Sequence, residues 1–199
     1  RDSTLEAGHI TLDLICGKQV TTPGSTEPLR FSIFPEGMRK ALKRFSSRGG
    51  NLLVSGANIG TDLWDRVYPV EPDSLYQAEG RRFAEQVLGF TRVTDQACNN
   101  GTVKAAGSEE LSGIPDILRY RDTMNEEAYW VGNPDGIKPS DSRGGIFLRY
   151  ADTDISAGIW SRRRGYSTVC LGFPLETICS VEDLNALMKA SLDFLEGQD

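Results

Sequence analysis

Several carboxylate side chains stand beside strand-like runs, where an acid could take part in catalysis. They are Asp62, Asp152, Asp154 and Glu176. Two carboxyl groups held a fixed distance apart can hydrolyse a glycosidic bond, one as the acid and the other as the base or nucleophile. Asp152 and Asp154 also fit a turn, because aspartate side chains bond to nearby backbone there. Glu176 directly follows the last strand-like run, and it is the best single candidate for a functional acid.

Arginine side chains near these acids would serve a different reaction. A polysaccharide lyase needs a base for the proton beside a uronate carboxylate, and a cation that neutralises that carboxylate. The arginines that could provide the cation are Arg119, Arg121 and Arg149. A lyase and a glycoside hydrolase are therefore both open as enzymatic alternatives.

A glycine-rich loop follows the apolar run 51–55 and supplies further polar groups. Glycines let the backbone turn sharply and point amides at a ligand. The loop lacks the Lys-Ser/Thr pair of a phosphate-binding loop and the Gly-x-Ser-x-Gly pattern of a nucleophile elbow. Ser55 would need a base, and His9, the one histidine of the chain, precedes the first strand; a turn serine is favoured. The candidate ligand-binding residues are Ser55, Gly56, Asn58, Asp62, Trp64 and Glu176.

Aromatic side chains could add stacking surfaces for sugar rings, since they present flat apolar faces. The residues in question are Trp64, Tyr68, Trp130 and Trp160. Trp64 and Tyr68 come just after the glycine-rich loop. The alternative, which is the commoner use of such residues, is that they cap the hydrophobic core.

The composition argues against several kinds of partner. The net charge is -6 and the pI about 4.9, so we expect no nucleic-acid partner. The cysteines Cys16, Cys98, Cys170 and Cys179 lack zinc-site spacing, and with a single histidine we expect no metal and no other cofactor. No run approaches the ~20 apolar residues of a membrane span. The basic run 162–164 is expected in a solvated turn.

Hydrophobic periodicity predicts a regular succession of elements. Strands are expected at 10–16, 51–55, 145–150, 157–161 and 167–173, with strand-like fragments at 102–106 and 117–120. Helices are expected at 35–47, 73–88 and 181–195, the last one capped by Ser180. The continuous apolar run 51–55 is typical of a parallel strand covered on both faces.

This succession predicts an α/β fold, a three-layer sandwich with a mostly parallel central sheet and an irregular insert around 91–142. We expect residues 1–199 to form a single domain that is part of a larger protein. In such sheets ligands bind beyond the carboxyl ends of the strands, so the loops after Ser55 and Phe173 are the candidate site loops.

Two segments resemble the class I glutamine amidotransferase fold, which is flavodoxin-like. Gly49-Gly50 precedes an apolar strand and a glycine-rich turn, and 170–176 resembles the Phe-His-Pro-Glu segment of that family. The resemblance places Gly56 where the family has its cysteine and Pro174 where it has its histidine. It therefore implies a pseudoenzyme without glutaminase activity, because neither residue supplies a nucleophile or a base.

A second resemblance covers almost the whole chain. The segments 12–19, 49–56, 60–62 and 171–178 resemble a family of exported gut-bacterial proteins often labelled xanthan lyase. This resemblance implies a secreted, periplasmic or cell-envelope location, and a further sequence ahead of Arg1.

Together these observations predict a catalytically degenerate, amidotransferase-like domain that serves as a binding or scaffolding module. Its partner would be a polysaccharide or neighbouring domains of the same protein. The alternative is a carbohydrate-active enzyme, a polysaccharide lyase or glycoside hydrolase, that uses carboxylates and arginines at the strand ends.

Overall fold

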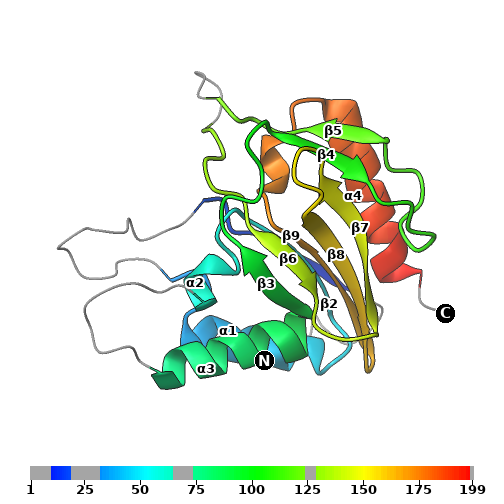
Figure 1. Cartoon of the computed structure of the whole chain (residues 1–199). Coiled ribbons are helices and arrows are strands. Elements are labelled where there is room, and N and C mark those ends of the chain that lie inside the picture. The colour runs from blue at the N-terminus through cyan, green and yellow to red at the C-terminus, as the bar shows by residue number, and fades with distance from the viewer. Residues whose placement is uncertain (1–9, 19–31, 65–73, 124–128, 198–199) are drawn as a thin grey trace.

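A computed structural model of the chain describes residues 10–18, 32–64, 74–123 and 129–197. Its main feature is a seven-stranded sheet in the order β1-β2-β9-β8-β7-β4-β5 (Figure 1). The strands are β1 (Thr11–Ile15), β2 (Asn51–Ser55), β4 (Thr102–Ala105), β5 (Ile117–Arg119), β7 (Gly144–Tyr150), β8 (Ser156–Arg163) and β9 (Tyr166–Leu171).

The sheet is mixed and mostly antiparallel. Only β1 with β2 and β2 with β9 pair in parallel, whereas β9, β8, β7, β4 and β5 pair antiparallel in succession. The reason lies in the short connections: two residues, Arg164 and Gly165, join β8 to β9, with Gly165 at φ +86°. Such a hairpin can join only antiparallel neighbours, because a parallel pair needs a long crossover. The predicted three-layer sandwich with a mostly parallel, flavodoxin-like sheet is therefore wrong.

The predicted irregular insert around 91–142 is also wrong for much of its length. Its strands β4 and β5 extend the main sheet and curl over the C-terminal helix (Figure 1). Two more strands, β3 (Phe90–Thr94) and β6 (Gly136–Pro139), form a separate antiparallel pair. The insert thus supplies part of the fold's framework.

Helices pack on the two faces of the sheet near its parallel end. On one face lie α1 (Glu36–Ser46), α3 (Ser74–Phe83) and the π-helical turn η1 (Ala84–Leu88). On the other lies α4 (Val181–Glu196), preceded by the short η2 (Leu175–Thr177). A short helix, α2 (Thr61–Trp64), follows the glycine-rich loop. The predicted cap of α4 is confirmed, since Ser180 Oγ accepts the Asp183 N–H at 3.1 Å.

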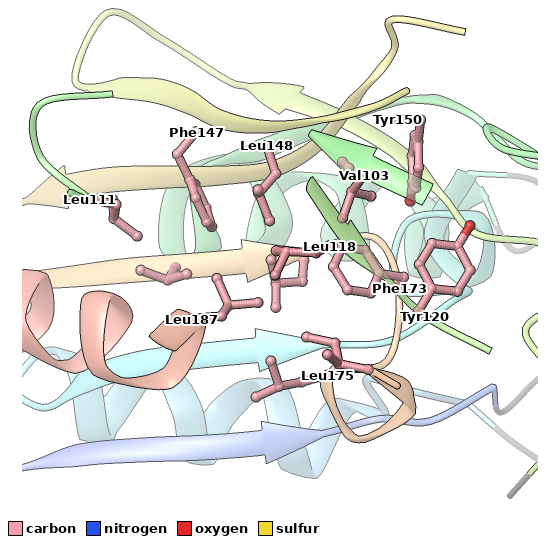
Figure 2. Close-up of a cluster of buried hydrophobic side chains, with 14 of the residues drawn as sticks. Val103, Leu111, Leu118, Tyr120, Phe147, Leu148, Tyr150, Phe173, Leu175 and Leu187 are labelled. Carbon is pink, nitrogen blue, oxygen red and sulfur yellow. The ribbon is translucent and has the colours of Figure 1, made fainter. Parts of the chain in front are cut away.

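Two hydrophobic clusters divide the interior, because alternate residues of β2 point to opposite faces of the sheet. Leu53 belongs to the cluster under α4, and Leu52 and Val54 belong to the cluster under α1 and α3. Figure 2 shows how the cluster under α4 draws on the curled end of the sheet as well. Its side chains include Val103, Leu118, Phe147, Leu148, Tyr150, Phe173 and Leu187.

Among the described residues, no helix is long and apolar enough to cross a membrane.

Candidate functional site

The loop after β2 is tightly packed. Ser55 is fully buried, and the structure gives its hydroxyl no hydrogen-bond partner. A Cβ added to Gly56 would lie 2.8 Å from Cys16 Cβ and 2.9 Å from Ile59 Cγ2, so a side chain has no room there. The Gly56 N–H donates to the Leu171 carbonyl at 3.2 Å. The glycine therefore lets three segments approach closely, and the loop offers no open cavity at this point.

The other candidate residues of the loop hold the chain in place. Asn58 is buried, and its carbonyl accepts the Asp62 N–H. The Asp62 carboxylate accepts from Ser32 Oγ at 3.2 Å and from the Ile33 N–H at 3.1 Å. Trp64 packs at 6.1 Å, between ring centroids, on Phe90. These contacts account for the side chains of Asp62 and Trp64 without a ligand.

Glu176 is different, because its side chain is exposed on η2 just beyond β9. The Tyr129 hydroxyl donates a hydrogen bond to Glu176 Oε1. Gly17, in the turn after β1, leaves the space for this pair, since a Cβ there would lie 3.3 Å from the phenol oxygen. Partial burial, and then the bond to Glu176, raises the pKa of Tyr129. The phenol thus stays protonated at neutral pH and acts as a donor.

Lys18 joins this pair to an exposed indole. Its Nζ donates to the Trp130 carbonyl at 3.1 Å and lies 5.0 Å from the Trp130 ring centroid. The Tyr129 ring centroid is 5.8 Å away from the same ammonium group. At these distances the ammonium and the rings attract each other. We call Lys18, Tyr129, Trp130 and Glu176 the crest cluster.

A second carboxylate lies close enough to couple with the crest cluster. Partial burial and then the charge of Glu176 raise the pKa of Asp13 above its ordinary value. Burial, followed by the charges of Glu176, Asp13 and Asp62, raises the pKa of Cys16 to about 12. Cys16 is therefore a neutral thiol at neutral pH and not a nucleophile. The crest cluster and Asp13 together offer two coupled acids, a phenol and an ammonium group.

A cavity of about 280 Å³ opens beside Trp130. It is lined by Gln96, Cys98, Asn99, Gly101, Tyr120, Asp122, Trp130, Val131, Gly132 and Asn133. We call it the indole cavity.

The remaining acids and arginines make their contacts with residues outside the crest cluster. Asp152 accepts the Asn99 N–H at 2.9 Å, a contact between segments 53 residues apart. Asp154 pairs with Lys104 at 2.8 Å and lies 3.9 Å from Arg149. Arg119 is exposed on β5. Both aspartates lie in the connection between β7 and β8, and these contacts occupy their carboxylates.

The other sequence-based candidates are distributed as follows. Trp160 is half-buried, with its Nε1 donating to Ser108 Oγ at 3.1 Å and its ring 5.6 Å from Phe194. Tyr68 and His9 lie outside the described residues. All four cysteines are free, three of them buried. Among the described residues no cluster of His, Cys, Asp or Glu could hold a metal ion.

Sequence reasoning missed Lys18 and Tyr129, and it named Trp130 only as one of several stacking surfaces. The adjacent Tyr129-Trp130 pair in a turn-rich stretch was the available signal. Its partners could not be read from the sequence, because Lys18 and Trp130 are 112 residues apart.

Comparisons with known proteins give a fold and no family. No protein-family model matches the chain, and no curated protein matches it. Among solved structures it is similar to part of a β-galactosidase from Bacillus circulans sp. alkalophilus, with a TM-score of 0.50 and 9% identity over 95% of this chain. The match takes in 23% of that protein, so the chain spans about a quarter of its length. At this identity the likeness shows the fold alone.

These findings overturn the family resemblances drawn from the sequence. No family model matches the chain, so nothing supports its membership of the glutamine amidotransferase family or of the exported family labelled xanthan lyase. The mixed, mostly antiparallel sheet is not the flavodoxin-like sheet that the first resemblance implied. A degenerate amidotransferase is therefore not the right description of this chain.

Proposed function

We propose that this domain recognises carbohydrate within a carbohydrate-active protein of the cell exterior, and that the crest cluster is its sugar site. The observation that carries the proposal is the exposed Trp130, 38% accessible, flanked by an ammonium group and a carboxylate–phenol pair. Sugars bind to proteins through flat apolar faces that stack on rings and through hydroxyls that bond to polar groups. The similarity of the fold to part of a β-galactosidase supports this direction.

The groups of the crest cluster have complementary roles in such a site. The indole offers the stacking surface, and the Glu176 carboxylate accepts hydroxyl protons more strongly than a neutral acceptor. Lys18 donates to ring or hydroxyl oxygens. Its bond to the Trp130 carbonyl also ties the turn after β1 to the segment that carries the indole, which keeps these groups together before a ligand arrives.

A second candidate function is glycoside hydrolysis at the same crest. It rests on Asp13, because partial burial and then the charge of Glu176 raise the pKa of this carboxyl, and a general acid needs a raised pKa. The domain would then cleave the sugar chain that it binds.

Binding is tested by titrating oligosaccharides into the whole chain by calorimetry, with a panel that covers gluco-, galacto-, manno- and xylo-oligosaccharides. We expect Trp130→Ala to abolish binding and Glu176→Gln to weaken it roughly tenfold or more, as expected for losing a hydrogen bond to a charged group. The matched controls Trp64→Phe and Glu196→Gln should bind like the wild type, since Trp64 packs on Phe90 and Glu196 is exposed at the end of α4. If Trp130→Ala bound oligosaccharides as tightly as the wild type, the crest cluster would not be the sugar site.

Hydrolysis is tested on the same panel by following new reducing ends. Release that disappears in both Asp13→Asn and Glu176→Gln would establish the enzyme. Binding without release, in the presence of intact Asp13 and Glu176, would leave recognition as the function.

A further inference from the structure

The indole cavity has the dimensions of a site for one small unit. Its volume, about 280 Å³, is close to the lower end of the range for small-molecule sites. Its lining residues lie at 96–101, 120–122 and 130–133. An extended polymer does not fit in this volume, but one ring of a longer chain does.

The wall of the cavity is held in position by a glycine. A Cβ added to Gly132 would lie 2.6 Å from Trp130 Cζ3 and 2.7 Å from Cη2, so the indole lies directly against the glycine backbone. Lys18 approaches the same ring at 5.0 Å. The indole therefore borders both the crest cluster and the indole cavity, and a sugar chain stacked on it can contact both.

The backbone of the cavity is fixed before any ligand binds. The Val131 N–H donates to the Arg121 carbonyl at 2.9 Å, and the Ala97 N–H donates to the Pro134 carbonyl at 2.9 Å. Beneath them, Tyr120 stacks on the buried Phe173 with ring centroids 5.1 Å apart. A preformed site loses less conformational freedom on binding.

The polar lining consists of amides and one carboxylate. Gln96, Asn99, Asn133 and Asp122 are exposed at the cavity, and Asp122 lies against Gly101. Asn99 also bonds through its Nδ2 to the Asp152 carboxylate at 3.1 Å, which adds a second negative charge nearby. None of the described residues that line the cavity is basic.

This distribution of charge discriminates between sugars. A neutral sugar donates its hydroxyl protons to the amide oxygens and to Asp122. A uronate in the cavity brings its carboxylate toward Asp122 and Asp152, and the repulsion of like charges opposes its binding. Lys18, whose Nζ is 5.0 Å from the indole centroid, does not line the cavity. A uronate-specific lyase needs the opposite arrangement.

We propose that the indole cavity is a subsite for one uncharged sugar residue stacked against Trp130, and that Asp122 makes it reject uronates. This deepens the proposed function and rests on it. The crest cluster would then hold the neighbouring residue of the same sugar chain.

The test compares neutral and acidic ligands of matched linkage. Cello-oligosaccharides and β-linked oligoglucuronates of the same length are titrated into the whole chain at low ionic strength, by calorimetry and by quenching of tryptophan fluorescence. We expect the neutral ligand to bind and the uronate to bind at least about tenfold more weakly. Asp122→Asn should reduce the ratio of the two affinities, neutral over uronate, about three- to tenfold, as expected for one charge at close range in a partly exposed site. The matched variant Asp116→Asn, an exposed carboxylate outside the lining, should leave it unchanged.

The outcomes separate the subsite from the function that it rests on. Equal binding of the two ligands, or a preference that Asp122→Asn does not change, overturns the subsite even when Trp130→Ala abolishes binding. No binding of any oligosaccharide overturns both proposals. Circular dichroism of each variant confirms the fold, and Trp130→Phe, which keeps a ring in place, should retain weakened binding.

Discussion

The carboxylate of Asp135 accepts the backbone N–H of Gly60 at 2.6 Å, although the two residues are 75 positions apart. The same carboxylate accepts the Thr61 N–H at 3.0 Å and the Thr61 hydroxyl at 2.6 Å. Asp135 is fully buried. It thus ties the glycine-rich loop after β2 to the turn before β6, and it satisfies the first amides of α2.

Replacing Asp135 by alanine should destabilise the protein by about 2–4 kcal/mol, because two backbone N–H groups and a hydroxyl lose their acceptor in the interior. Urea unfolding followed by circular dichroism measures this change. Asp116→Ala, at an exposed position, should cost less than about 0.5 kcal/mol. A variant Asp135→Ala as stable as the wild type would show that the bond network does not hold the loop.

The same residue should make stability depend on pH. Burial raises the pKa of Asp135 to about 7, although the bonds from Thr61 and Gly60 act in the opposite direction. The unfolded chain binds this proton with the ordinary pKa, near ~4. The folded protein therefore holds the proton more tightly, and the associated stability is complete below about pH 4 and is lost as the pH rises to about 7.

The measurement is the difference in the free energy of unfolding between the wild type and Asp135→Asn, whose amide does not titrate, as a function of pH. Relative to this variant, the free energy of unfolding of the wild type should fall between about pH 4 and pH 7, with a slope no steeper than about 1.4 kcal/mol per unit. Using the difference cancels other groups, such as Asp141, whose pKa is lowered chiefly by its hydrogen bond to Arg143. Parallel curves would mean that Asp135 titrates normally in the folded state.

The local elements of the fold could be read from the sequence. The strand at 51–55 and the helices at 35–47 and 181–195 appear at or within a residue or two of the predicted bounds, because periodicity and capping are properties of neighbouring residues. Strand direction could not be read in the same way, since it depends on pairing between distant segments. The short connection before β9 is a local indication of a hairpin.

Burial of charge was harder still to predict. Arg162 and Arg163 were expected in a solvated turn, but both lie in β8. The Arg163 side chain is 2% exposed and pairs with Asp141 at 2.8 Å. A basic run is usually solvated, because burying a charge costs desolvation energy. Asp141, from the segment before β7, offsets that cost for Arg163. Glu176 and Trp130 were each named as candidates, but their grouping with Lys18 and Tyr129 was not predicted, because the four residues come from three separated segments.

Glycine positions offer a matched pair of stability tests. A Cβ added to Gly172, just after β9, would lie 1.9 Å from the Asp135 carbonyl oxygen, which is backbone and cannot rotate away. Gly172→Ala should therefore cost about 3 kcal/mol or more. In contrast, Gly37 of α1 has nothing within 4 Å, and Gly37→Ala should stabilise the protein by about 0.5–1 kcal/mol. Thermal unfolding of both variants tests the packing at each site, and a neutral Gly172→Ala would contradict the close approach at β9.

The bond between Tyr129 and Glu176 should be visible in the titration of the phenol. The Glu176 carboxylate accepts the phenol proton and its charge opposes formation of a phenolate, so Glu176→Gln should lower the pKa of Tyr129 toward its ordinary value. Glu196→Gln should leave that pKa unchanged. Carbon-13 NMR of tyrosine-labelled protein resolves the residue, with Tyr129→Phe providing the assignment.

In sugar binding, Tyr129→Phe should weaken affinity by about five- to tenfold, as expected for one lost hydrogen bond. An unshifted phenol in Glu176→Gln would show that the two side chains do not interact in solution, and the crest cluster would then contain no carboxylate–phenol pair.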